Sequence, residues 1–281
     1  MKYLILSITL LVFWNEVPAK TYRSWDDALE NRREVTTIRI NNKIMEEIPD
    51  IFDKFPNLEE LVLENNKIKS LPPSLFRAKK LKKLSLYRNK LKSIPDEIVR
   101  LENLEELSFS YNEIASAGDS VFYLPRLQKL YLTGNKLETV SASLKNLDNL
   151  TVLKLGHNQL DSLPGELTQL SKLELLEVTN NYLETLPGNI GLLTELRFLY
   201  IGRNRLVNIP ASIGYCQKLQ ELDAAWCGVV QLTSALSEIR TLENVYIDER
   251  TIPFYPNPRN AFRQRITVVG RGENVYRPSQ N

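Results

Sequence analysis

The chain has 281 residues, of which 43% are hydrophobic, 25% charged and 9% aromatic, and 36 Lys and Arg nearly balance 34 Asp and Glu. This composition is typical of globular proteins, and its apolar content excludes a mostly disordered chain. The net charge of +2 argues against a nucleic-acid interface made by excess basic charge. Two Cys and one His exclude a disulfide scaffold and a zinc site built from several such ligands.

Residues 1–19 have the pattern of a secretory signal peptide. Lys2 precedes an apolar run of 12 residues, and Val17 and Ala19 are small residues before Lys20. Because a membrane-spanning helix needs about 20 apolar residues, we expect cleavage at this point and a mature chain without a membrane span. The protein is then secreted or periplasmic. An apolar helix packed on the domain is the alternative for this segment.

Residues 20–34 are predicted to form an N-terminal cap. Ser24 has the character of a helix N-cap, Asp27 follows three residues later, and Ala28 and Leu29 begin an apolar stretch. The short helix would place Trp25 over the exposed end of the core.

An aliphatic residue recurs every 23 positions from Val35 to Leu242, without an insertion, which defines ten units. Positions 1, 4 and 6 of each unit are apolar, as in Leu81, Leu84 and Leu86. Position 9 is asparagine in seven units: Asn66, Asn89, Asn112, Asn135, Asn158, Asn181 and Asn204.

Most units continue with an aliphatic–proline pair, such as Leu71-Pro72 or Ile94-Pro95. With its LxxLxLxxNxL pattern the chain resembles the leucine-rich repeat family over residues 35–252. It is most similar to the 23-residue subclass of Ras-pathway scaffold and plant resistance-type repeats, and its cap resembles those of exported bacterial repeat proteins. The resemblance implies an α/β solenoid with a curved parallel sheet on the concave face and 3₁₀ or short helices on the convex face.

Elementary geometry supports the same fold. Alternation at positions 4 and 6 suits a short strand with one buried side, and stacked units place these strands in one parallel sheet. The seven asparagines then form a buried ladder in which each amide bonds to backbone groups of neighbouring units. Proline suits the start of an outer 3₁₀ segment because it has no N–H to satisfy.

Both cysteines fall on positions that face the core. Cys216 stands at position 21 of unit eight, and Cys227 takes the ladder position of unit nine. These positions lie at opposite corners of a coil, so two small core residues are expected in preference to a disulfide.

Residues 253–281 are predicted to close the stack. Prolines end the repeat after residue 252, residues 260–265 suit a helical turn, and residues 266–269 suit a closing strand before a frayed tail.

The concave face divides into two regions. In units two to five, charges of alternating sign at positions 2 and 3 predict lateral ion pairs. Around units six to nine, apolar and aromatic residues with polar edges predict a docking surface, here called the aromatic surface, with Gly156 and Gly202 leaving room beside it. Its residues are Tyr131, Val152, Lys154, His157, Leu175, Phe198, Tyr200, Arg203, Asp223, Trp226 and Tyr246.

We therefore expect a monomeric, non-enzymatic module that binds a protein or peptide, with no cofactor, metal or nucleic acid. The single His157 has no predicted nucleophile beside it, which argues against catalysis. Three alternatives stay open. In the first, the aromatic residues pack only against one another and bind no partner. In the second, the ligand is a glycan or cell-wall component. In the third, the leader is retained and the protein is a cytoplasmic scaffold for a small GTPase or kinase.

Overall fold

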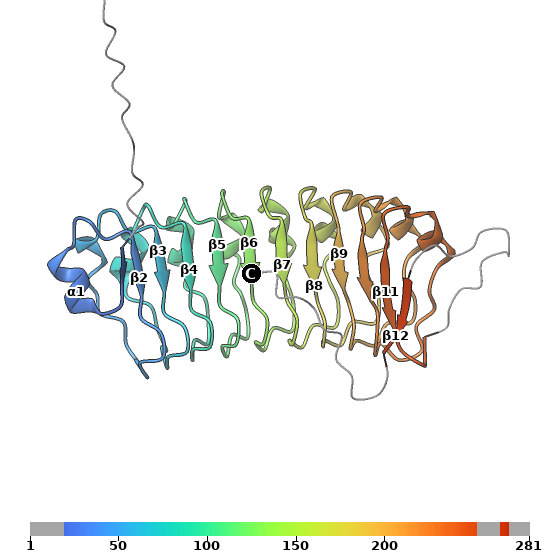
Figure 1. Cartoon of the computed structure of the whole chain (residues 1–281), viewed down its shortest axis with the longest axis horizontal. Coiled ribbons are helices and arrows are strands. Elements are labelled where there is room, and N and C mark those ends of the chain that lie inside the picture. Colours follow the sequence, from blue (N-terminus) through green and yellow to red (C-terminus); the bar gives the residue numbers. More distant parts are fainter. Residues whose placement is uncertain (1–19, 252–264, 270–281) are drawn as a thin grey trace, which may run out of the picture.

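Parallel strands of two to four residues lie side by side in one sheet whose order follows the sequence (Figure 1). The computed structural model describes residues 20–251 and 265–269. The strands are β1 (Thr21–Tyr22), β2 (Thr37–Arg39), β3 (Glu60–Val62), β4 (Lys83–Ser85), β5 (Glu106–Ser108), β6 (Lys129–Tyr131), β7 (Val152–Lys154), β8 (Leu175–Glu177), β9 (Phe198–Tyr200), β10 (Glu221–Asp223), β11 (Asn244–Ile247) and β12 (Arg265–Val268).

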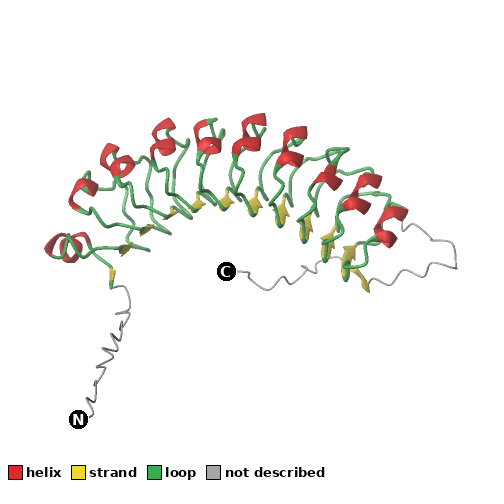
Figure 2. Ribbon diagram, turned by 90° about the horizontal axis from the view of Figure 1, so that it is seen from above, coloured by secondary structure: helices red, strands yellow, loops and turns green. Residues whose placement is uncertain are grey.

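Short helices lie on the opposite side of the coil, and Figure 2 shows them along the outside of an arch whose inner side is the sheet. After α1 (Trp25–Glu30), the 3₁₀ segments are η1 (Phe52–Lys54), η2 (Pro73–Arg77), η3 (Asp96–Arg100), η4 (Ser120–Tyr123), η5 (Ala142–Asn146), η6 (Gly165–Gln169), η7 (Ile190–Leu192), η8 (Ala211–Tyr215) and η9 (Ser234–Glu238). The sheet is therefore concave, and the predicted α/β solenoid is confirmed.

The register of the sheet follows the 23-residue period. Leu61 pairs with Leu84, and Leu84 with Leu107, so that residues at the same position of successive units become neighbours. All three side chains are fully buried. Each unit alone cannot enclose its apolar side, and stacking buries the leucines in one continuous core.

The asparagines of position 9 bond each unit to the one before it. The Oδ1 atom of Asn89 accepts from the Ile68 N–H at 3.0 Å, while its Nδ2 donates to the carbonyls of Leu63 and Leu86 at 2.9 and 3.0 Å. The same pattern recurs along the ladder, whose side chains are at most 8% exposed. Backbone groups at the turn of each coil are thereby satisfied without water.

Cys227 continues the ladder with a thiol in place of an amide. Its Sγ lies 3.2 Å from the Ile201 carbonyl oxygen, which is the contact that Asn204 makes with Val178 in the preceding unit. Both Cys216 and Cys227 are buried and free.

The two ends of the described stack are covered differently. At the first end Ser24 Oγ accepts from the Asp27 N–H at 3.2 Å, and the Trp25 ring packs edge-on against Phe52 with centroids 5.9 Å apart. At the other end β12 pairs with β11. Arg265 is the first residue of this strand and not the end of a helical turn, because its backbone is engaged in the sheet. The rest of that turn, the leader, the proline-rich break and the tail lie outside the described residues.

Candidate functional site

The candidate site is built from three rows of side chains that the register of the sheet sets across the concave face. Val152, Leu175 and Phe198 are direct lateral neighbours. A second row runs from Tyr131 through Lys154, Glu177, Tyr200 and Asp223 to Tyr246. The third row, at position 8, contains His157, Arg203 and Trp226.

Position 8 has a backbone conformation that the sequence pattern did not reveal. Its φ lies between 54° and 70° in units one to nine, the left-handed region that most side chains avoid. Glycine and asparagine tolerate the left-handed conformation better than other residues. Their presence at position 8 of four units is the sequence signal that could have predicted it. The residues are Asn42, Asn65, Arg88, Tyr111, Gly134, His157, Asn180, Arg203 and Trp226.

Phe198 is the centre of the aromatic surface. Its ring stacks on that of Tyr200, with centroids 6.5 Å apart and planes inclined by 29°, and the Arg197 guanidinium lies 5.6 Å from the Phe198 ring centroid. Phe198 itself is half-buried. The ring is therefore held in one orientation while part of it stays accessible to a partner.

Three residues predicted to be exposed are buried instead. Leu175 is 4% exposed, Tyr200 8% and Asp223 4%. The Tyr200 ring stacks on Phe198 of its own strand, and the Asp223 carboxylate turns toward the backbone to accept from the Ala225 N–H at 2.9 Å. The accessible residues of the surface are the exposed His157 and Arg203 and the half-buried Tyr131, Val152, Lys154, Phe198, Trp226 and Tyr246.

The predicted space beside two glycines is also filled. A Cβ on Gly156 would lie 2.6 Å from Glu177 Oε1, and one on Gly202 would lie 3.0 Å from both carboxylate oxygens of Asp223. These glycines admit polar side chains of the next unit and leave no room for a ligand.

Trp226 joins units nine and ten. Its backbone N–H donates to the Asp248 carboxylate, which also accepts from the Arg250 N–H at 2.7 Å. The indole Nε1 is buried and has no hydrogen-bond partner among the described residues.

The chemistry of the described residues gives no support to catalysis. His157 Nδ1 lies 3.1 Å from the amide Nδ2 of Asn180, which is not a nucleophile. Burial raises the pKa of both thiols, Cys216 and Cys227, to about 12, which keeps them in the unreactive protonated form. Within residues 20–251 and 265–269, no group of three His, Cys, Asp or Glu is arranged to hold a metal ion.

The ion pairs expected in units two to five are present. Lys82 lies 2.8 Å from Glu59, and Glu106 lies 2.7 Å from Lys83 and 3.8 Å from Lys129. Because these pairs are partly exposed to solvent, each contributes about 1 kcal/mol or less, and their main effect is to neutralise this edge of the face.

An aromatic cluster in units three and four was missed by the sequence reasoning. The Tyr87 and Tyr111 rings meet edge to face at 5.3 Å, and the Arg88 guanidinium lies 5.2 and 5.5 Å from their centroids. A Cβ on Gly134 would lie 2.7 Å from the Tyr111 ring. Tyr111 and Gly134 are at position 8 of successive units. A glycine that follows a tyrosine at this position in the next unit is the sequence signal that could have predicted the cluster.

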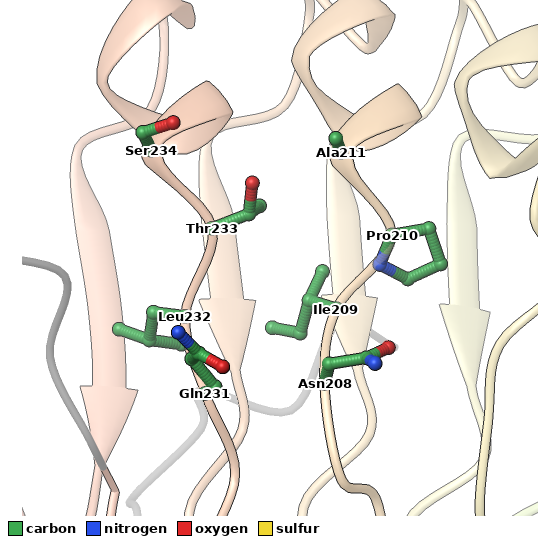
Figure 3. Close-up of a pocket in the computed structure, with 8 residues that line it drawn as sticks. All are labelled: Asn208, Ile209, Pro210, Ala211, Gln231, Leu232, Thr233 and Ser234. Atoms are coloured by element: carbon green, nitrogen blue, oxygen red, sulfur yellow. The ribbon is translucent and has the colours of Figure 1, made fainter.

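A hollow of about 380 Å³ lies between units eight and nine, on the stretches that lead into η8 and η9 (Figure 3). Its lining has no ionisable side chain, so it offers little for specific recognition: Asn208, Ile209, Pro210, Ala211, Gln231, Leu232, Thr233 and Ser234.

Comparison with known families decides what this solenoid is. Three family descriptions match: "Leucine rich repeat" over residues 56–114, "Leucine Rich repeats (2 copies)" over 102–147 and "Leucine-rich repeat region" over 127–252. The chain belongs to the leucine-rich repeat family. None of the curated proteins matches this leucine-rich repeat chain significantly in sequence.

Solved leucine-rich repeat structures share its fold. A leucine-rich repeat protein of Leptospira interrogans is 22% identical, with a TM-score of 0.59 over 89% of this chain and 81% of its own. The internalin InlF of Listeria monocytogenes is 22% identical, with a TM-score of 0.59 over 78% of this chain and 69% of its own. The structure of a complex of Latrophilin 3, Unc5D and the FLRT2 repeats matches at 22% identity and a TM-score of 0.65, over 86% and 78% of the two chains.

The part of the chain that the structure describes includes no helix long and apolar enough to cross a membrane.

Proposed function

We propose that this leucine-rich repeat protein is a non-enzymatic module that binds a protein or peptide through the concave face of units six to nine. The observation that carries the proposal is the ordered Phe198–Tyr200 stack beside Arg197, with Trp226 in the adjoining row. Pre-oriented aromatic and arginine side chains contribute most of the free energy at protein interfaces. Leucine-rich repeat families are generally non-catalytic interaction modules, which supports the same function.

The test compares capture of partners from the native host by three forms of the chain. The double variant F198A/W226A should lose the specifically captured protein, while Y182A/Y215A should retain it. Tyr182 and Tyr215 are 46% and 75% exposed and lie off the concave strands, so they control for the loss of surface aromatic area. Thermal melts of all three establish that they are folded.

Unchanged capture by F198A/W226A would refute the proposal, and so would equal loss in both double variants. A glycan array probed with the same three proteins distinguishes glycan binding from protein binding. Binding to a glycan that depends on Phe198 and Trp226, without any captured protein, would assign the surface to sugars.

We also propose that the protein is exported. The support is the leader pattern of residues 1–19, with small residues before Lys20. Mass spectrometry of the protein recovered from its native host should find Lys20 as the first residue. An intact Met1 would contradict export and favour the cytoplasmic scaffold.

A further inference from the structure

A stretch of the concave face adjoins the aromatic surface, shares Tyr131, Lys154 and His157 with it, and has no acidic residue at three positions of each unit. Positions 5, 7 and 8 of units three to six have no Asp or Glu, and we call these positions the acid-free floor. They are Ser85, Tyr87, Arg88, Ser108, Ser110, Tyr111, Tyr131, Thr133, Gly134, Lys154, Gly156 and His157. Acidic residues return at the same positions on both sides of it, at Glu64 in unit two and Glu177 in unit seven.

The two permanent cations of the acid-free floor are held by aromatic rings and not by carboxylates. The Arg88 guanidinium lies over Tyr87 and Tyr111, and Lys154 Nζ lies 5.7 Å from the Tyr131 ring centroid. Neither cation forms an ion pair with a described residue, whereas Lys82, Lys83 and Lys129 at the neighbouring positions 2 and 3 all do. Neither charge is therefore paired directly, although Glu177 is the lateral neighbour of Lys154 on the next strand.

The acidic residues at its borders accept from hydroxyl groups and form no ion pair with Arg88 or Lys154, although the Glu177 carboxylate fills the space beside Gly156 of the floor. Glu64 Oε1 accepts from Ser85 Oγ at 2.6 Å, and Glu177 Oε1 accepts from Thr179 Oγ1 at 3.1 Å. The Glu64 carboxylate is thus bound to a floor residue, Ser85, and the Glu177 carboxylate to a residue of its own unit.

The rings around Arg88 are also fixed in advance. Tyr111 has a left-handed backbone with φ of 57°, and its ring occupies the space that any side chain on Gly134 would need. The edge-to-face contact with Tyr111 fixes the orientation of the Tyr87 ring. Arg88 therefore packs against two pre-oriented rings, Tyr87 and Tyr111, here called the aromatic corner. Little side-chain entropy is then lost when a ligand binds.

We propose that the acid-free floor binds an acidic peptide segment of the partner, with carboxylates at Arg88 and Lys154 and apolar contact along Tyr87, Tyr111 and Tyr131. Arginine presents a planar fork that matches a carboxylate, and tyrosine-rich surfaces suit peptides. Strands lie about 4.8 Å apart, so four units span about 14 Å, the length of four or five extended residues. The inference rests on the proposed recognition role of the concave face.

The experiment measures fluorescence anisotropy of a fluorescein-labelled hexaglutamate peptide with the chain from Lys20 onward. The wild type should bind this peptide at about 20 mM salt and more weakly at about 150 mM, because screening weakens exposed charge contacts. A hexalysine peptide should not bind. The variant R88Q/K154Q should bind hexaglutamate at least about tenfold more weakly.

The matched control is R205Q/K145Q, which removes the same charge away from the floor. Arg205 also lies on an exposed tyrosine, with its guanidinium 4.6 Å from the Tyr182 centroid, and Lys145 is exposed on η5. The control should bind like the wild type. Equal weakening in both double variants, or no binding by the wild type at low salt, would overturn the proposal.

Two further arms make the result specific. Y111A should weaken peptide binding, since it removes one wall of the aromatic corner. F198A/W226A should leave hexaglutamate binding unchanged, so the floor and the aromatic surface can fail separately. If a sulfated oligosaccharide binds through Arg88 and Lys154 while hexaglutamate does not, the peptide assignment is wrong.

Discussion

The left-handed backbone at position 8 is unfavourable for every residue there that has a bulky side chain. For residues other than glycine this conformation costs about 1–2 kcal/mol, because Cβ approaches the carbonyl oxygen. Five units nevertheless have Arg, Tyr, His or Trp at this position. Side chains that oppose the backbone preference on the concave face are consistent with the proposed role in recognition.

His157 tests the cost of this conformation. H157G should be more stable than H157A by about 1 kcal/mol, because alanine keeps the unfavourable left-handed backbone and glycine relieves it. Urea denaturation measures both. At the exposed Gln159, where φ is not positive, the order should reverse, with Q159A more stable than Q159G by about 0.5–1 kcal/mol. Glycine ranking below alanine at both positions would contradict the explanation.

Asn158 tests the ladder. The variant N158A leaves the Leu137 N–H without its acceptor and removes one of the two amide donors to each of the Leu132 and Leu155 carbonyls, all in the buried turn. The unfolding free energy should fall by about 2–4 kcal/mol, measured with urea. The neighbouring exposed variant Q159A should change it by less than about 0.5 kcal/mol. Similar values for the two variants would mean that the ladder contributes little.

At the scale of the unit, units eight and nine differ from the others because they contain the cysteines. The ladder contact is kept by the Cys227 thiol, and Cys216 contacts the Ile190 carbonyl at 3.5 Å. Both are neutral donors in buried positions, and ionisation would leave a charge without solvation.

The pH dependence of these thiols follows from their pKa values. The folded state favours the protonated thiol, since burial raises the pKa from 9.0 to about 12. The stabilisation is complete below pH 9 and is lost as the pH rises toward about 12. We expect the unfolding free energy of the wild type to decrease between about pH 8.5 and 10.5, and that of C216A/C227A to decrease less.

Thiol labelling supplies an independent check. At about pH 8 neither cysteine should react with a disulfide reagent in the folded protein, and both should react in urea. Rapid labelling without denaturant would show that the two units open locally.

Much at this scale follows from the sequence alone. The period predicts the strands and the ladder, because 23 residues per coil without an insertion leave one way of stacking, and the N-cap pattern of Ser24 and Asp27 predicts the capping helix. Burial on the concave side is different, since the repeat positions of Tyr200 and Asp223 do not predict that both are buried. Their exposure depends on curvature and on rotamers, which a repeat pattern does not contain. The Arg88 cluster was missed for the same reason, because its rings come from adjacent coils and different positions.

For the whole molecule, stability depends on how the stack is closed. Trp25 packs on Phe52, a fully buried residue of the first unit, and also contacts the core beneath it. In a solenoid each coil touches only its neighbours, so damage at one end should stay near that end.

The variant W25A tests this locality. Removing the indole should lower the unfolding free energy by about 2–4 kcal/mol and speed amide hydrogen exchange in the first two units. Exchange in units six to nine should be unchanged. Y215A, on the exposed convex face, is the control and should change neither quantity. Faster exchange throughout the chain would show that the solenoid opens as a single cooperative body.

The constant 23-residue length has a consequence for how such a protein can change in evolution. Excision of residues 127–149, one full coil, would leave the flanking strands in phase and move Arg88 closer to Phe198 by one strand spacing. Tandem duplication of a coil would do the opposite. The separation between two recognition elements can thus be adjusted in fixed increments of about 4.8 Å, without redesign of the residues that make either contact.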